Sequence, residues 1–271
     1  MRTVLAALDA SAAARAVLET ALGIAELTGA TVEAVHVHYG STDTPESLAS
    51  RSGVPFRLLD GATEPALLDA LAGPDVIAAV LGARATPGGR RPTGHTALRV
   101  LERANKPIVV VSPESVGVSP RPFHRLLLPL EGTESSSRPV TECLCPLIVG
   151  DVELLVLHVF TADTMPRVLD RPERDLQLLG GEFLARYCPN ATQIALRTGS
   201  VGSQVGAACR DESADLVVLS WAQEASAGHA AVVRDVLSHA AVPVLLLPVD
   251  DARVIDLGAV ASQPEATPTP R

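Results

Sequence analysis

The sequence predicts an α/β protein with mostly parallel strands, built as two copies of one plan. Three observations support this class. Short apolar runs rich in Val and Leu recur at strand length without polar alternation, as in parallel strands covered on both faces. Ala- and Leu-rich stretches of helical length separate these runs, and strand–helix alternation is typical of α/β proteins. The order of features in the first half also returns in the second.

Each half contains four strand-like runs, interspersed with helix-like stretches such as Ser11–Thr28 and Gln204–Ser213. The predicted strands are Thr3–Leu8, Val32–His38, Val76–Leu81 and Pro107–Val111 in the first half, then Arg125–Leu130, Val152–Phe160, Leu216–Leu219 and Pro243–Leu247 in the second.

The spacing of matching features supports the internal repeat. Asp9 matches Glu131 and His36-Val37 matches His158-Val159, both at a separation of 122 residues, whereas Pro107 matches Pro243 at a separation of 136. The second half therefore contains 14 more residues after its second strand. The first half looks trimmed at this place, because residues 40–52 are polar, include Pro45 and show little helical periodicity.

The boundary between the copies is predicted at Pro113–Pro122, which contains three prolines and no usable apolar face. The expected domains are therefore 1–113 and 123–250. The remaining residues, 251–271, are rich in Pro and Thr and are predicted to be a largely disordered tail.

Composition excludes several classes of function. Lys106 is the only lysine of the 271 residues and precedes Pro107, so no P-loop is present and a lysine Schiff-base enzyme is nearly excluded. The net charge of −9 makes the chain a poor candidate for nucleic-acid binding. No apolar run approaches the roughly 20 residues that span a bilayer. The N-terminus shows no signal peptide, so a cytoplasmic protein is expected.

The cysteines and histidines carry no strong motif. Cys143, Cys145, Cys188 and Cys209 lack the spacing of redox or zinc sites and are interpreted as small hydrophobic residues in a reducing compartment. His36 and His38 share a strand face, which suits a metal, but no partner is evident nearby; a structural role at the strand end is the preferred interpretation, and no metal site is predicted.

Several short segments together resemble the universal stress protein family. The first strand ends in Ala7-Leu8-Asp9-Ala10-Ser11, the second in His36-Val37, and the last is Pro107–Val111. Their order, repeated twice, covers nearly all of residues 2–113 and 123–249. The resemblance implies two tandem Rossmann-like, doubly wound parallel sheets of the adenine nucleotide alpha hydrolase-like type, with ligands at the carboxyl ends of the strands. It also implies a stress-response role and frequent dimerisation.

In nucleotide-binding members, the resemblance implies Gly-x-x-Gly, nine residues, then Gly-Ser/Thr. Here Gly82 occupies the first glycine position, and Ala85 replaces the second glycine. Only eight residues, Thr86–Thr93, separate Ala85 from Gly94, where the pattern has nine. His95 takes the Ser/Thr position, and Thr96 follows it. Such glycines let backbone amides approach phosphates at a helix start, and arginines supply positive charge. The alternative is a solvated loop with Thr96 as a helix cap.

By resemblance, Asp9 accepts a hydrogen bond from the base or ribose, and Val37 frames the adenine. The candidate nucleotide-binding residues are Ala7, Asp9, Val37, Gly82, Arg84, Gly88, Gly89, Arg90, Gly94, His95 and Thr96. The expected ligand is ATP or AMP, with Mg²⁺ only as a companion of ATP.

The second copy looks degenerate. Ser220 replaces the first glycine, Glu131 replaces Asp9, and Glu224 would repel phosphate where the first copy has arginines. Gly199–Ser203 superficially suggests a phosphate loop. It is interpreted instead as a helix start capped by Ser203, with Gly61–Glu64 as its counterpart.

These features predict a cytoplasmic stress-response sensor or regulator with one nucleotide site in the first copy. The two copies are expected to pack as an intramolecular pair, with a homodimer and an unknown protein partner as further possibilities. The alternative is a nucleotide-free protein-interaction module of the same fold. No motif positions a general base, so no enzyme is predicted, and slow ATP hydrolysis is the weakest hypothesis.

Overall fold

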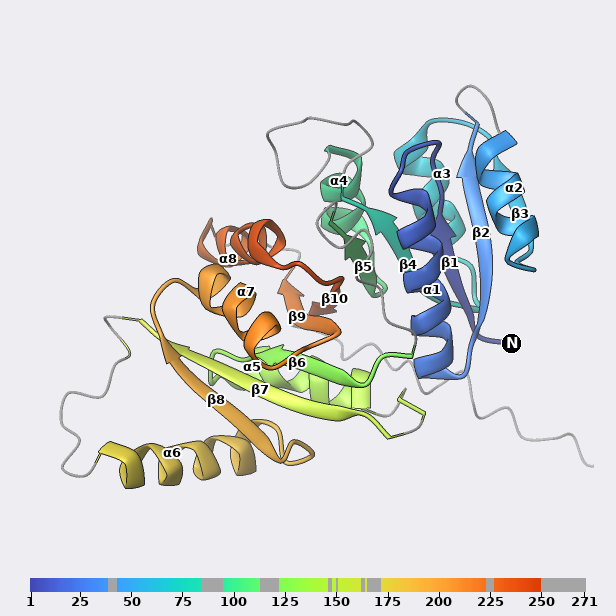
Figure 1. Cartoon of the computed structure of the whole chain (residues 1–271). Coiled ribbons are helices and arrows are strands. Elements are labelled where there is room, and N and C mark those ends of the chain that lie inside the picture. The colour runs from blue at the N-terminus through green and yellow to red at the C-terminus, as the bar shows by residue number, and fades with distance from the viewer. Residues whose placement is uncertain are drawn as a thin grey trace, which may run out of the picture.

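The chain alternates strands and helices throughout the computed structural model (Figure 1), which describes residues 1–38, 43–83, 95–112, 122–145, 148–149, 151–161, 164, 172–222 and 227–249. The elements of the first half are β1 (Thr3–Ala7), α1 (Ala14–Thr28), β2 (Thr31–Val37), α2 (Asp43–Arg51), β3 (Phe56–Leu59), α3 (Thr63–Leu71), β4 (Val76–Gly82), α4 (His95–Arg103) and β5 (Ile108–Val111).

The second half repeats this order, except that a short α-helix continuing into a π-helix replaces the long first helix. Its elements are β6 (Arg125–Pro129), α5 (Glu134–Arg138), the π-helix η2 (Pro139–Leu144), β7 (Glu153–Phe160), α6 (Pro172–Tyr187), β8 (Gln193–Thr198), α7 (Val201–Asp211), β9 (Leu216–Ala222), α8 (Ala227–His239) and β10 (Val244–Val249).

All ten strands join one sheet in the order β3-β2-β1-β4-β5-β10-β9-β6-β7-β8. Within each half the described strand pairs are parallel, and β5 and β10 pair antiparallel where the halves meet. The strand order of the second half is that of the first, reversed. The predicted α/β class with mostly parallel strands is confirmed, and each half contributes five parallel strands. The two expected sheets are joined into one through the β5–β10 pair.

Strand register shows the repeat residue by residue. The matching triplets of laterally paired residues are Leu5–Ala79–Ile108 in the first half and Leu127–Val217–Val244 in the second. At the junction Val109 lies opposite Leu245, with Val110 opposite Val244. Since Ile108 corresponds to Val244, the β5–β10 pair relates the halves by a pseudo-twofold axis at Val109 and Leu245, like an isologous interface within one chain.

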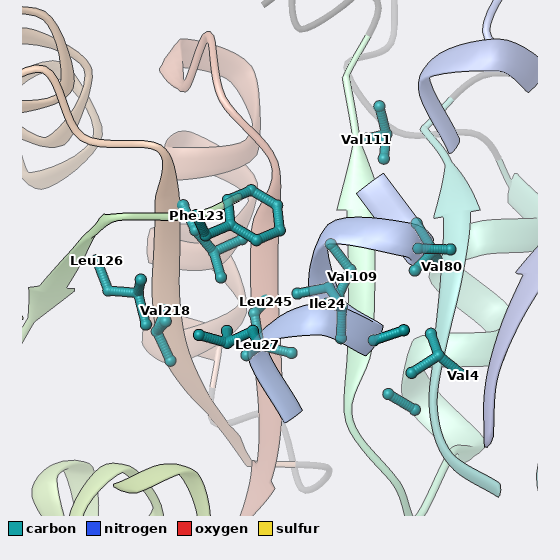
Figure 2. Close-up of a cluster of buried hydrophobic side chains, with 14 of the residues drawn as sticks. Val4, Ile24, Leu27, Val80, Val109, Val111, Phe123, Leu126, Val218 and Leu245 are labelled. Carbon is teal, nitrogen blue, oxygen red and sulfur yellow. The ribbon is translucent and has the colours of Figure 1, made fainter. Parts of the chain in front are cut away.

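Two hydrophobic layers cover the sheet, and each runs across both halves. Residues of α1, α2, η2 and α6 pack on one face, and residues of α3, α4, α7 and α8 pack on the other. Figure 2 shows the first layer, in which Ile24 and Leu27 of α1 lie beside Leu245 and Phe123 of the second half. The strands are apolar on both sides because helices bury both faces, as expected for a parallel sheet.

Three elements differ from the sequence expectation. Residues 43–51 form α2 despite their polar composition, so the interpretation of residues 40–52 as non-helical is wrong. Pro45 lies in the first turn, where a missing N–H breaks no helical hydrogen bond. The short strands β3 and β8, at the two edges of the sheet, have no counterpart among the predicted runs.

The single lysine serves the fold. Lys106 Nζ donates to the carbonyl oxygens of Gly73 (2.6 Å), in the connection between α3 and β4, and of Val76 (2.7 Å), the first residue of β4. Partial burial lowers the pKa of this ammonium group. Lys106 thus ties the start of β5 to the start of β4.

The described cysteines lie in hydrophobic surroundings. Cys188 and Cys209 are buried, and burial raises the pKa of Cys188 to about 11 and that of Cys209 to about 12. Both therefore stay as thiols near neutral pH and behave as small apolar side chains.

Several expectations lie outside the described residues: most of the linker at 113–122 and the tail at 251–271. Within the part of the chain that the structure describes, no helix is long and apolar enough to span a membrane.

Gly23 provides a test of the packing between the halves. A Cβ at Gly23 would lie 2.7 Å from Cε2 of Phe123, whose ring is buried. We expect Gly23→Ala to lower the free energy of unfolding by about 1–3 kcal/mol, the usual cost of overpacking, measured by urea titration. Gly181→Ala is the control, because nothing lies within 4 Å of its Cβ; it should be neutral or slightly stabilising. Equal stability of the two variants would contradict this packing.

Candidate functional site

The candidate site lies at the switch point of the first half, between the carboxyl ends of β1 and β4. These strands are neighbours, yet α1 leaves β1 toward one face of the sheet while α4 leaves β4 toward the other. In open parallel sheets, ligands bind where the connections of two neighbouring strands diverge in this way. Asp9 follows β1, and Gly82 ends β4, so these two predicted residues flank the switch point.

Asp9 builds the turn from β1 into α1. Its Oδ1 atom accepts hydrogen bonds from the backbone N–H (3.0 Å) and the Oγ–H (2.5 Å) of Ser11. Ser11 Oγ in turn accepts from the N–H of Ala13 (3.2 Å), the residue before α1. Both of these bonds are accepted by Oδ1, an Asx-turn geometry that needs only one side-chain oxygen.

Gly82 leaves room beside the first turn of α1. A Cβ at this position would meet Val17 Cγ2 at 3.7 Å and Ala13 Cβ at 3.9 Å, which are ordinary contacts. The fold itself therefore tolerates a side chain here. Ala7 and Val37, at the ends of β1 and β2, pack in the hydrophobic layer of the opposite face, with α3 and α4.

The structure brings together only part of the predicted site. Ala7, Asp9, Val37 and Gly82 lie at the carboxyl edge of adjacent strands. Arg84, Gly88, Gly89, Arg90 and Gly94 lie outside the described residues. His95 begins α4, but its side chain is not among those described; Thr96 is the second residue of α4 and is half-buried. The phosphate-binding half of the site therefore stays a prediction.

In both halves a histidine of the second strand is hydrogen-bonded to the residue that follows the first strand. We call this contact the histidine clamp. Nδ1 of His36 lies 2.7 Å from the carbonyl oxygen of Leu8, and Nδ1 of His158 lies 2.9 Å from that of Leu130. A carbonyl only accepts, so Nδ1 carries the proton in each ring. The bond joins the second strand to the loop after the first strand. In the first half this loop continues into Asp9 of the candidate site.

His36 and His38, the histidine pair considered for a metal, lie in different environments. His36 is buried, and no partner of its Nε2 atom is found among the described residues. His38 follows the strand and is exposed. The described residues contain no group of three or more side chains suited to hold a metal ion.

The same region of the second half is filled by side chains. Gly132 (φ 85°), in the loop after β6, has Phe183 of α6 against it: a Cβ there would lie 2.9 Å from Phe183 Cε2. His158 contacts this ring and that of Phe160, with centroids 4.7 and 4.6 Å away. Ser220, the counterpart of Gly82, is buried.

The segment Gly199–Ser203, which superficially suggests a phosphate loop, already binds a carboxylate of the same chain. Oδ2 of Asp235, from α8, accepts hydrogen bonds from the N–H of Gly202 (2.9 Å) and from Ser200 Oγ (3.1 Å) at the start of α7. Ser200 is the N-cap residue, so the expectation that Ser203 caps the helix is wrong. The capping group comes from another helix, and only folding brings it there. Gly61 and Gly199 both have positive φ two residues before their helices, which supports their correspondence.

Comparisons with known proteins agree with this architecture. Residues 1–79 match the model of the universal stress protein family. A functionally unknown protein of Pseudomonas aeruginosa PAO1 is 13% identical, with 93% of this chain and 94% of that chain covered and a TM-score of 0.66. A universal stress protein from Archaeoglobus fulgidus DSM 4304 is 15% identical, with 93% and 97% covered and a TM-score of 0.59. No curated protein matches by sequence.

These comparisons confirm the resemblance to the universal stress protein family, in the sequence of residues 1–79 and in the fold of nearly the whole chain. The ten-stranded sheet agrees with a tandem, two-domain organisation.

The clamp on Leu8 gives a measurable contribution to stability. His36→Phe removes the donor and leaves the carbonyl of Leu8 unpaired, which we expect to cost about 1–3 kcal/mol in the free energy of unfolding. His36→Asn, which keeps a side-chain donor, should restore part of the loss. His38→Phe serves as the exposed control and should change stability by less than about 0.5 kcal/mol. Chemical denaturation checks all three, and equal effects at positions 36 and 38 would refute the clamp.

Proposed function

We propose that the first half binds an adenine nucleotide, ATP or AMP, and that the protein acts as a nucleotide-dependent sensor or regulator in a stress response. One observation carries the proposal: Asp9 and Gly82 flank the switch point of a doubly wound parallel sheet, at the carboxyl ends of β1 and β4. This is where such sheets hold nucleotides.

We assign the adenosine moiety to the described residues of this strand edge, on the basis of their chemistry. Ala7 and Val37 provide apolar strand ends, and Gly82 presents backbone without a side chain beside α1. Asp9 is held in place by Ser11 through Oδ1. Its carboxylate has acceptor capacity beyond these two bonds, for an amino group of the base or a ribose hydroxyl.

The phosphates are assigned to the connection between β4 and α4. Its arginines, Arg84 and Arg90, supply positive charge in a chain of net charge −9. Gly88, Gly89 and Gly94 suit close backbone approach, and α4 begins at His95, so the helix N-terminus faces this connection. His95 and Thr96 are the side chains assigned to the phosphates at the helix start. Mg²⁺ would enter only with ATP.

We assign no nucleotide to the second half and propose that it supports the first. Phe183 packs against the loop after β6, and Ser220 stands where the first half has Gly82. The start of α7 already binds the Asp235 carboxylate. Because β5 and β10 pair within the chain, a homodimer would have to use another surface. We propose no enzymatic activity, because no motif of the sequence positions a general base.

The role of Asp9 is testable because one substitution separates its contact with Ser11 from its proposed contact with the nucleotide. Asp9→Asn keeps an Oδ1 acceptor for Ser11 and so preserves the turn, but removes the carboxylate charge. At ATP concentrations 100-fold above Kd, binding should stabilise the wild type by about 2.7 kcal/mol, seen as a rise in Tm. We expect Asp9→Asn to lose most of this rise while keeping the ligand-free Tm.

The matched control is Glu131→Gln, the equivalent change in the second half, which should keep the full rise. Absence of any thermal shift or calorimetric heat when nucleotide-stripped wild type meets millimolar ATP, ADP or AMP would refute the proposal. That result would favour the nucleotide-free interaction module.

A further inference from the structure

The only tryptophan of the chain connects the second half to α4 of the first. Trp221 follows Ser220 in β9 and is buried. Its indole Nε1–H donates to the carbonyl oxygen of Leu101, 3.2 Å away and 120 positions earlier in the sequence. A buried indole N–H normally requires such a partner.

The bond satisfies a group that α4 cannot satisfy itself. Leu101 lies in the last turn of α4, where the final four carbonyls lack intrahelical partners. An indole from the other half therefore completes the carboxyl end of this helix. The buried face of α4 also shares one hydrophobic cluster with Trp221 and α8. The buried α4 residues in it are Ala97, Val100 and Leu101, and Ala104, the residue after the helix, joins them.

At the matching position of the first half, the Trp221 contact has no equivalent. Strand register places Ala83 in the first half at the position of Trp221. Ala83 is buried but has no side-chain donor, so it cannot hold α8 in the same way. The otherwise symmetric halves thus differ at this contact, and the helix that is held begins beside the candidate phosphate-binding residues.

We propose that Trp221 is a positioning residue for the nucleotide site: it holds α4 so that the start of this helix meets the phosphates, and it senses occupation of the site. The inference rests on the proposed function. From His95 to Leu101 an α-helix rises only about 9 Å, and a hydrogen-bonded helix of this length moves as a unit. A change at its first turn therefore reaches the indole.

The test combines Trp221→Phe, which keeps an aromatic ring but removes the donor, with Phe123→Leu as control. Phe123 lies in the interface between the halves but packs on the α1 face, away from α4. In ligand-free protein, we expect the amides of α4 to exchange with deuterium roughly 2- to 10-fold faster in Trp221→Phe, as for the loss of one net hydrogen bond. Phe123→Leu should leave α4 exchange unchanged relative to the rest of the first half.

The second measurement is ATP binding. By calorimetry, Trp221→Phe should bind ATP roughly 2- to 10-fold more weakly than the wild type, because the competent arrangement of α4 is less populated. In the wild type, ATP should also change the emission of the single tryptophan.

The outcomes separate the two proposals. If wild type binds ATP but its emission stays constant, and Trp221→Phe binds equally well with unchanged α4 exchange, the positioning role is overturned and the nucleotide site stands. If Phe123→Leu weakens ATP binding and speeds α4 exchange as much as Trp221→Phe does, the effect is a general loss of packing between the halves. The specific positioning role of Trp221 is then overturned. If wild type binds no adenine nucleotide, the proposed function fails, and the positioning role fails with it.

Discussion

The antiparallel pairing of β5 with β10 is the constraint on which the rest of the molecule depends. Each half has a five-stranded parallel sheet with one strand edge at β5 or β10, and the pairing around Val109 and Leu245 closes both edges at once. Exposed strand edges carry unpaired backbone groups that invite association. Joining the edges makes the two hydrophobic layers continuous across the molecule. The halves therefore stabilise one another through backbone hydrogen bonds and shared cores.

The two halves differ at their switch points, although a pseudo-twofold axis relates them. Symmetry places equivalent strand ends at equivalent positions, but the residues there differ. In the first half the turn after β1 is held by Asp9 and Ser11, and Gly82 leaves space beside α1. In the second half aromatic side chains occupy the matching region, and Trp221 extends across the junction to α4. The two switch points therefore differ in the side chains around them, and the proposed nucleotide site is assigned to the first half.

Much of the fold was predictable because it depends on local and periodic signals. The central strands are continuous apolar runs, and constant spacing revealed the repeat and the equivalence of His36 with His158. The edge strands β3 and β8 and the helix α2 were missed, because partly exposed elements carry mixed composition and depend on neighbours. Of the candidate site, the sequence correctly placed Asp9, Val37 and Gly82 at strand ends. The capping of α7 by Asp235 was unpredictable, because 33 residues separate the carboxylate from the N–H of Gly202 that it caps.

By itself the sequence determined the α/β class, the two copies and the strand ends at which the candidate site residues lie. These properties follow from periodicity, glycine and proline positions and charge, which act over a few residues. Only the tertiary structure decided how the copies meet, that both histidines clamp the loops after the first strands, and that Trp221 completes α4. Such contacts join groups that are distant along the chain, and their partners are selected by packing and by the need to satisfy buried polar groups.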